Sequence, residues 1–243
     1  MTIPEHIEPT FSAPPQTLTC NGLLFDMDGT IIDSTDAIVK HWRQIGREIG
    51  VDPEVILATS HGRRSIDVLK PYEPKLANWE YISHIEGSIP KKFGADATEI
   101  PGSRQLLNKL EEHAVPWCIV TSGTRPLITG WLDIMELAHP KFLVTAEDVE
   151  NGKPDPACYE MGKVKLGLPH REPSFVVFED APAGVRAGKA AGCIVVALNT
   201  THTLDQLREA GADLIVRDAR SVALKAWDKS KGEVQIEITD ALA

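Results

Sequence analysis

The sequence predicts an α/β fold, a Rossmann-like parallel sheet core with an inserted α-helical domain. The first observation is that short apolar runs alternate with helical patterns along most of the 243 residues. Such runs are typical of strands buried on both faces, and their alternation with helices predicts a parallel sheet covered on both sides. The second observation is that residues 36–100 carry only helical patterns and interrupt this alternation.

Six apolar runs are expected as the strands of the core sheet. They cover residues 23–27, 115–122, 141–145, 174–179, 193–198 and 214–216. Five helical patterns belong to the same core and cover residues 102–113, 125–137, 156–166, 183–191 and 204–210. Residues 234–238 alternate polar and apolar side chains, and this period of two predicts an additional strand at an edge of the sheet.

The helical insertion, residues 36–100, separates the first two strands by more chain than a crossover connection needs. Its helices are expected over residues 37–50, 53–59, 65–70 and 79–93. We expect the insertion to lie over the carboxyl edge of the sheet as a lid, and the alternative is a lobe packed rigidly on the core. The core then comprises residues 16–35 and 101–243. Residues 1–15 contain four prolines and are expected as a disordered lead-in.

The composition excludes several classes of protein. The formal net charge is −10 and no basic stripe is present, so nucleic acid is not expected as a partner. No apolar run approaches the roughly 18 residues of a membrane-spanning helix, and the first residues lack the features of a secretory signal. The four cysteines are widely spaced, which favours free thiols and a cytoplasmic protein. No close His or Cys pair suggests zinc.

Two carboxylates, Asp26 and Asp28, follow the first expected strand directly. Residues two apart in a strand point to the same side, and open α/β sheets bind ligands at the carboxyl ends of their strands. Two acids this close repel each other unless a cation or a shared proton separates them. Gly29 lets the chain turn at this point, so a plain turn is the alternative to a metal site.

Three later strand ends carry further candidates for chemistry. Thr121-Ser122-Gly123 offers hydroxyls and backbone amides for a phosphate, or simply starts a helix. Lys153 lies between a glycine and a proline that restrict the backbone, and it either offsets phosphoryl charge or is a surface lysine. Glu179-Asp180 ends a buried strand, where acids are costly unless they are paired or bound to metal. The alternative for Asp180 is a helix cap.

These segments occur in the order and rough spacing of the four motifs of haloacid dehalogenase (HAD) superfamily phosphatases, which the chain resembles from residue 21 onward. The helical insertion resembles the small helical cap of that family. Segments 60–64, 85–90, 122–125 and 177–184 are similar to those of fungal glycerol-phosphate phosphatases and, in part, of 2-deoxyglucose-6-phosphate phosphatases. The resemblance therefore implies a phosphatase that hydrolyses a small phosphorylated polyol or sugar. Glycerol phosphate is the first candidate and 2-deoxyglucose 6-phosphate or another sugar phosphate is the alternative.

The resemblance also implies roles for the acids. Asp26 would be the nucleophile that forms an aspartyl-phosphate, and Asp28 would be the general acid and base. Mg²⁺ would be held by Asp26, the backbone carbonyl of Asp28 and Asp180, with Glu179 in support, because oxygen ligands suit this ion.

The remaining implied roles concern the substrate. Thr121, Ser122 and Gly123 would bind phosphate oxygens, and Lys153 would balance charge in the transition state. In the cap, the candidates for reaching the substrate are His61, Arg63, Arg64 and Glu86. Either arginine could instead form a surface salt bridge. We expect the enzyme to act as a monomer.

Two other functions are compatible with the same fold. A phosphomutase similar to β-phosphoglucomutase would carry a cap histidine twelve residues after the nucleophile, but Ile38 occupies that position and His41 is the nearest histidine. A phosphate-sensing protein without catalysis is the second alternative, although every chemical position is intact in this chain.

Overall fold

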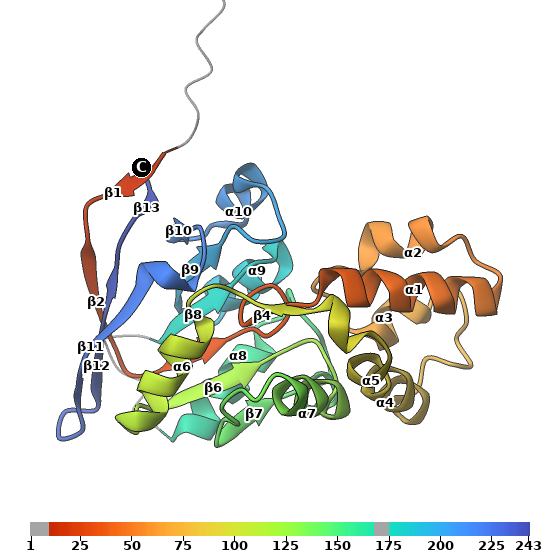
Figure 1. Ribbon diagram of the computed structural model, residues 1–243, viewed down its shortest axis with the longest axis horizontal. Coiled ribbons are helices and arrows are strands. Elements are labelled where there is room, and N and C mark those ends of the chain that lie inside the picture. Colours follow the sequence, from red (N-terminus) through yellow and green to blue (C-terminus); the bar gives the residue numbers. More distant parts are fainter. Residues whose placement is uncertain (1–9, 168–174) are drawn as a thin grey trace, which may run out of the picture.

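The computed structural model describes residues 10–167 and 175–243, and its centre is a six-stranded sheet (Figure 1). Its strands are β3 (Leu23–Phe25), β6 (Trp117–Val120), β7 (Phe142–Val144), β8 (Val176–Glu179), β9 (Ile194–Leu198) and β10 (Leu214–Val216). The strand order is β10-β9-β8-β3-β6-β7, and every neighbouring pair is parallel. The predicted α/β class and its six core strands are confirmed, although residue 174 of the expected fourth run lies outside the described residues.

Helices surround this sheet, as the sequence predicts. They are α6 (Ser103–Glu112), α7 (Arg125–Ile134), α8 (Ala157–Leu166), α9 (Pro182–Ala190) and α10 (Leu204–Ala210). Successive strand residues enter two different hydrophobic clusters. Leu23 and Phe25 belong to one cluster, whereas Leu24 belongs to the other. Both faces of β3 are therefore buried, which explains why its sequence is continuously apolar.

The C-terminal segment differs from its prediction. Residues 234–238 fall in β12 (Glu233–Ile238), which is not an edge strand of the parallel sheet. β12 is the central strand of a separate antiparallel sheet, between β11 (Val222–Asp228) and β2 (Gln16–Cys20). Val234, Ile236 and Ile238 are buried in the first core cluster. The period of two correctly indicated one buried face, but it carried no information about which strands pair with it.

The expected disordered lead-in is wrong in part. β1 (Phe11–Ala13) pairs antiparallel with β13 (Ala241–Leu242) near the C-terminus. Residues 1–9 of the expected lead-in lie outside the described residues. Pairing with a strand from the far end of the chain cannot be read from a local pattern, which is why a short strand next to prolines escaped prediction.

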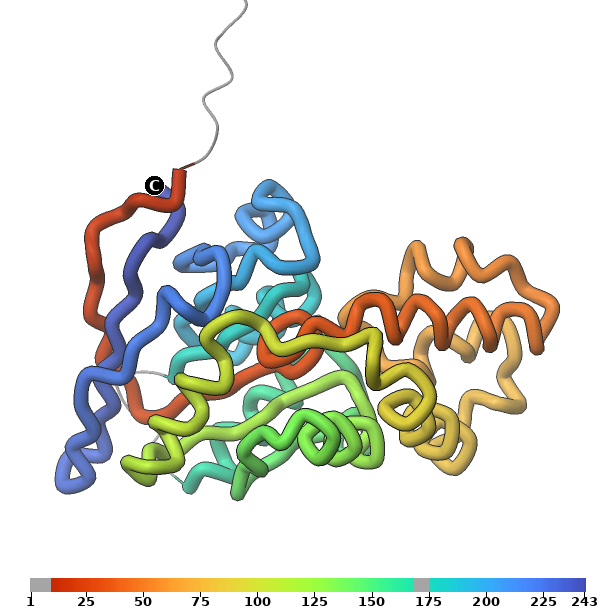
Figure 2. Tube along the Cα trace, in the orientation of Figure 1, coloured from red at the N-terminus to blue at the C-terminus, as the bar shows by residue number. Residues whose placement is uncertain are grey.

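The helical insertion lies between two short strands, β4 (Ile32–Asp33) and β5 (Thr98–Glu99), that pair antiparallel. Figure 2 shows the chain leaving the core after β4 and returning beside it. The insertion contains α1 (Thr35–Ile49), α2 (Pro53–Ser60), α3 (Ser65–Leu69), α4 (Trp79–Gly87) and α5 (Ile89–Phe93). We call this part the cap. Short 3₁₀ turns occur at Gly94–Asp96 in the cap, and at Ala146–Asp148 and Ala219–Ser221 in the core.

The cap has a hydrophobic cluster of its own, which includes Trp42, Ile45, Ile56 and Leu69. The single helix expected over residues 79–93 is two helices, separated at Ser88. Pro90 occupies the first turn of α5, where its missing N–H breaks no helical hydrogen bond. In the middle of a longer helix the same proline would remove one, so the chain begins a new helix instead. No helix of the described residues has the length and apolar character needed to cross a membrane.

Candidate active site

The carboxyl end of β3 carries Asp26, which is buried, and Asp28, which is partly exposed. The turn after them depends on Gly29, whose φ of +88° is unfavourable for other residues. A Cβ at this position would also overlap the carboxylate of Asp180. The glycine thus lets the ends of β3 and β8 approach closely and brings their acids together. The alternative of an ordinary hairpin turn is excluded by the parallel sheet.

Lys153 is a buried lysine at the centre of this site, not a surface lysine. Its Nζ lies 2.6 Å from Asp26 Oδ1, 2.6 Å from Glu179 Oε1 and 3.1 Å from the Val120 carbonyl oxygen. Burial by itself lowers the pKa of Lys153, but the attraction of Asp26 and Glu179 outweighs it and leaves the pKa raised. Lys153 therefore stays charged, and Tyr159 donates a further hydrogen bond of 2.7 Å to Glu179.

Asp26, Glu179 and Asp180 form an acidic cluster, with one oxygen of each within 4.8 Å of the others. All three are buried, and the ammonium of Lys153 contacts two of them, Asp26 and Glu179. Burial, together with repulsion from Glu179, raises the pKa of Asp26 to about 8 and that of Asp180 well above its ordinary value. This surplus of negative charge and the all-oxygen donor set fit a divalent metal ion. Thr201 and Thr30 donate hydrogen bonds to Asp180 and orient it.

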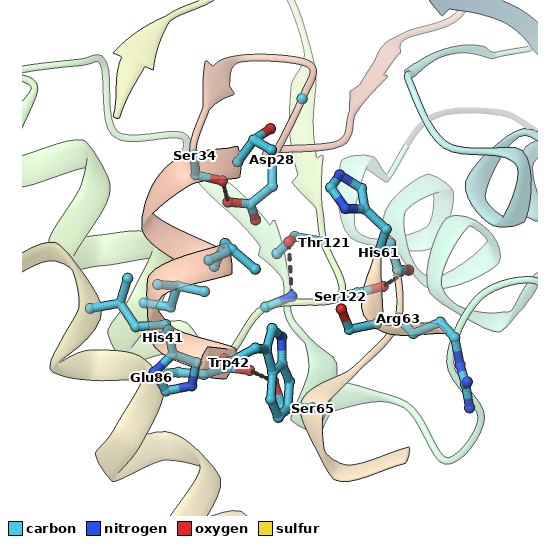
Figure 3. A pocket seen from close by; sticks show the side chains of 18 of the residues that line it. Asp28, Ser34, His41, Trp42, His61, Arg63, Ser65, Glu86, Thr121 and Ser122 are labelled. Carbon is cyan, nitrogen blue, oxygen red and sulfur yellow. Dashed lines mark hydrogen bonds between the residues drawn. The ribbon is translucent and has the colours of Figure 1, made fainter. Parts of the chain in front are cut away.

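The side chain of Asp28 lies outside the acidic cluster. Its Oδ1 accepts a hydrogen bond of 2.5 Å from Ser34, the residue just before α1 (Figure 3). Burial raises the pKa of Asp28, which favours a carboxyl group that retains its proton. The two acids of the first motif are thus placed differently: Asp26 contacts the ammonium of Lys153, while Asp28 faces the cavity beside the cap.

A cavity opens over these acids, between core and cap. The core contributes Asp26, Asp28, Gly29, Thr121, Ser122, Gly123, Leu127 and Asp180, and the cap with its connection contributes Ser34, Thr35, Ile38, His41, Trp42, Ser60, His61, Gly62, Arg63, Ser65, Glu86 and Ile89. Metal-site and nucleophile candidates therefore share one cavity with the predicted phosphate loop. Lys153 does not line it, because Asp26 covers its ammonium.

The predicted phosphate loop follows β6 and contacts the cap. Thr121 is buried, and its Oγ1 accepts a hydrogen bond of 3.0 Å from the Gly123 amide. Ser122 donates a hydrogen bond of 3.0 Å to the carbonyl oxygen of Gly62 in the cap. The loop thus places two hydroxyls and one backbone amide at the carboxyl edge of the sheet. A bound phosphate can accept hydrogen bonds from these groups in place of their present partners.

Glu86 connects three parts of the molecule. Its side chain is buried, accepts a hydrogen bond from Ser65 in α3, and accepts another of 2.7 Å from the backbone amide of Thr124, just before α7. This carboxylate thus reaches from the cap to the N-terminus of a core helix, where negative charge is favoured. Burial raises its pKa to about 7 in spite of both hydrogen bonds.

The raised pKa of Glu86 predicts a pH-dependent stability. The folded state resists ionisation of Glu86, so the free energy of unfolding of the wild type falls as pH rises from about 4.5 to about 7. Glu86→Gln can accept from the Thr124 amide and donate to the Ser65 hydroxyl, but it cannot ionise. We expect this variant to gain roughly 3 kcal/mol relative to the wild type between these pH values, measured by urea unfolding at pH 5 and pH 8. The control is Glu80→Gln, on the exposed side of α4. A constant difference between wild type and Glu86→Gln would contradict the assignment.

The two cap arginines differ in burial and in hydrogen-bond partners. Arg64 is buried and bound to Asp67, and it also donates to the carbonyl oxygens of Ala146, Val149 and Glu150. These hydrogen bonds connect the cap to the core. Arg64 does not line the cavity, so the geometry does not support the predicted contact between Arg64 and the substrate. Arg63 lies at the margin of the cavity, is exposed, and donates to the Thr59 carbonyl oxygen. In Figure 3 its guanidinium extends away from the cavity.

His61 lines the cavity near its opening, and its ring lies 5.2 Å from that of His202. His202 and Thr201 were not predicted as site residues. They come after the end of β9. Because parallel sheets bind ligands at the carboxyl ends of their strands, the sequence after this strand could also have been predicted to contribute to the site. His41, Trp42, Ser60 and Ser65 also line the cavity without a predicted role. Ile38, His41 and Trp42 are spaced as neighbours on one face of α1, which is the signal that was available for the last two.

Comparison with known proteins gives consistent results. The sequence profile of the haloacid dehalogenase-like hydrolases matches residues 23–198. Glycerol-1-phosphate phosphohydrolase 1 of Saccharomyces cerevisiae is 42% identical over 237 residues, which covers 94% of both chains. 2-Deoxyglucose-6-phosphate phosphatase 2 of the same yeast is 36% identical over 218 residues, covering 83% of this chain and 89% of that protein. The crystal structure of a hydrolase from Pseudomonas syringae superimposes with a TM-score of 0.69 at 25% identity, covering 82% and 94% of the two chains.

Proposed function

The chain belongs to the haloacid dehalogenase-like hydrolase family, and on this premise we propose that it hydrolyses glycerol phosphate with Mg²⁺ through an aspartyl-phosphate at Asp26. Its class is that of a phosphoric monoester hydrolase. The observation that carries the proposal is the pairing of Asp26 with a buried, charged lysine, while Asp28 lines the same cavity as Asp26 and is held by Ser34. One carboxylate is thereby available to attack and the other to supply a proton.

In the first half of the reaction, a bond forms between an Asp26 oxygen and phosphorus while the bond from phosphorus to the alcohol oxygen breaks. Asp28 gives its proton to the departing oxygen, and Ser34 holds its carboxyl group in place. In the second half, Asp28 takes a proton from water as the water oxygen bonds to phosphorus, and the bond to Asp26 breaks. Ser122 and the Gly123 amide bind phosphate oxygens in both halves.

The residues that would hold the metal are Asp26 and Asp180 through their carboxylates, and Asp28 through its carbonyl oxygen. Glu179 supports them while it accepts from Lys153 and Tyr159. A divalent cation supplies positive charge that reduces the repulsion between Asp26 and the phosphate. Mg²⁺ is proposed because the residues that would hold it offer only oxygen donors, which this ion prefers.

Glycerol phosphate is proposed as the substrate because the glycerol-1-phosphate phosphohydrolase of yeast matches along nearly the whole chain, cap included. Sugar phosphates are the second candidate, supported by the 36% identity with a 2-deoxyglucose-6-phosphate phosphatase. We propose that the enzyme acts as a monomer, as expected from the sequence. Its four cysteines are free and buried, which supports a cytoplasmic location.

The proposal is tested by phosphate release from a panel of esters. With Mg²⁺ present, we expect glycerol 1- or 3-phosphate to have a higher kcat/KM than 2-deoxyglucose 6-phosphate, hexose phosphates or hexitol phosphates. Exhaustive chelation should lower the rate by at least about a hundredfold, and added Mg²⁺ should restore it. Activity that survives chelation would contradict the metal site. Absence of phosphate release from every ester would leave a phosphate-sensing protein, and a requirement for a bisphosphate activator would indicate a phosphomutase.

A further inference from the structure

The cap side of the cavity contains a histidine with no assigned role. His41 lies on α1, lines the cavity and has only 4% of its surface exposed. Within residues 10–167 and 175–243, its buried Nε2 has no hydrogen-bond partner. An unpaired polar atom in a buried position is costly, and because His41 belongs to a residue set that lines the cavity, a bound ligand is the partner we consider.

We propose that His41 binds the hydroxyl groups of the substrate and so selects polyol phosphates over simple alkyl phosphates. This inference rests on the proposed function, because it assigns the end of the same cavity to the alcohol portion of the ester. In Figure 3, His41, Trp42, Glu86 and Ser65 occupy one part of the cavity and Asp28 another. The phosphate would lie near Asp28, and the alcohol portion would extend toward His41.

The chemistry of His41 suits neutral hydroxyl groups. Burial, with a smaller contribution from Lys92, lowers its pKa to about 4, so the ring is uncharged near neutral pH. A neutral imidazole has one N–H donor and one nitrogen acceptor. It can therefore donate to one hydroxyl group and accept from another. Its ring packs edge-on against Trp42 at 5.5 Å, which restricts its orientation.

The surroundings of His41 limit the length of the substrate. Ser34, which holds Asp28, immediately precedes α1 and lies seven residues before His41, or about 10 Å along the helix axis. Such a span has room for a phosphate and a short carbon chain. Ile38, Trp42 and Ile89 line the cavity here, and Glu86 is already hydrogen-bonded to Ser65 and Thr124. Among the described residues, Nε2 of His41 is thus a buried polar atom of a cavity-lining residue that has no hydrogen-bond partner within the protein.

The test compares glycerol 3-phosphate with n-propyl phosphate, which has the same carbon chain without free hydroxyls. His41→Phe keeps an aromatic ring and removes both nitrogens. We expect kcat/KM for glycerol phosphate to fall roughly 10- to 30-fold, the effect of losing one or two neutral hydrogen bonds. For propyl phosphate it should change by less than about twofold. His41→Gln, with a donor and an acceptor, should recover part of the preference. His84→Phe, on the exposed surface of α4, is the matched control.

The possible outcomes separate this inference from the proposed function. If the wild type hydrolyses neither ester, the proposed function fails. If it hydrolyses both, but His41→Phe keeps the wild-type ratio of the two kcat/KM values, only the assignment of His41 fails. An equal loss on both esters would likewise overturn it and leave His41 as a packing residue. If His41→Phe does not fold, His41→Leu, which is smaller, replaces it in the same comparison.

Discussion

Asp26→Asn is expected to lower phosphate release by about four orders of magnitude or more. An amide cannot attack phosphorus, and removal of a covalent nucleophile ranks among the largest single-residue effects in enzymes. The rate is measured as kcat/KM for glycerol phosphate under Mg²⁺ saturation. A variant that retains more than about a hundredth of wild-type activity would contradict the role of Asp26.

The loss should not come from unfolding. Burial disfavours the charge of Asp26, as its raised pKa shows, and repulsion from Glu179 and Asp28 adds to this effect. The uncharged variant should therefore unfold at the same temperature as the metal-free wild type, or at a higher one. Asp213→Asn is the matched control, because Asp213 is a hydrogen-bonded aspartate paired with Lys189 away from the cavity. We expect Asp213→Asn to keep wild-type activity.

Lys153→Met is expected to have the second largest effect, a loss of about three orders of magnitude in kcat. The variant keeps an unbranched side chain, one heavy atom shorter, but removes the ammonium that contacts Asp26 and Glu179. Without this charge, the Asp26 carboxylate loses its fixed orientation, and negative charge in the transition state loses its compensation. The rate is compared with the wild type by steady-state phosphate release.

The control for this variant is Lys163→Met. Lys163 is also a buried lysine, but it donates to the Ala191 carbonyl oxygen and pairs with Glu160, outside the cavity. Both variants are expected to lose stability, since each leaves a buried partner without its hydrogen bond. Only Lys153→Met should lose kcat. Equal kcat values in the two variants would reduce Lys153 to a structural residue.

The parallel sheet and the core of the site were predictable because their signals are local. Residues 23–25 and 176–179 are apolar on both faces, and the acids follow directly where each strand ends. The order of strands in a parallel sheet then brings those ends together without further information. Lys153 also follows a strand of this sheet and therefore lies at the same carboxyl edge. No local sequence pattern, however, predicts its contacts with Asp26 and Glu179.

The parts that escaped prediction depend on long-range contacts. β12 alternates in the expected way, but β2, its partner on one side, lies more than 200 residues earlier in the chain. The cap arginines illustrate the same limit, because adjacent residues face different surroundings. Arg64 donates to backbone carbonyl oxygens of the core, whereas the guanidinium of Arg63 donates to the Thr59 carbonyl oxygen near the end of α2. Sequence spacing cannot decide which of the two turns inward.

The most direct test of the central claim is to find where the phosphoryl group goes during a single turnover. Excess enzyme is mixed with glycerol phosphate and Mg²⁺, quenched in acid within milliseconds, digested and examined by mass spectrometry. We predict a transient phosphoryl group on the peptide that contains Asp26, and none in Asp26→Asn treated in the same way. Wild-type turnover in which phosphate appears without any phosphorylated protein, or with phosphate on another residue, would contradict the account.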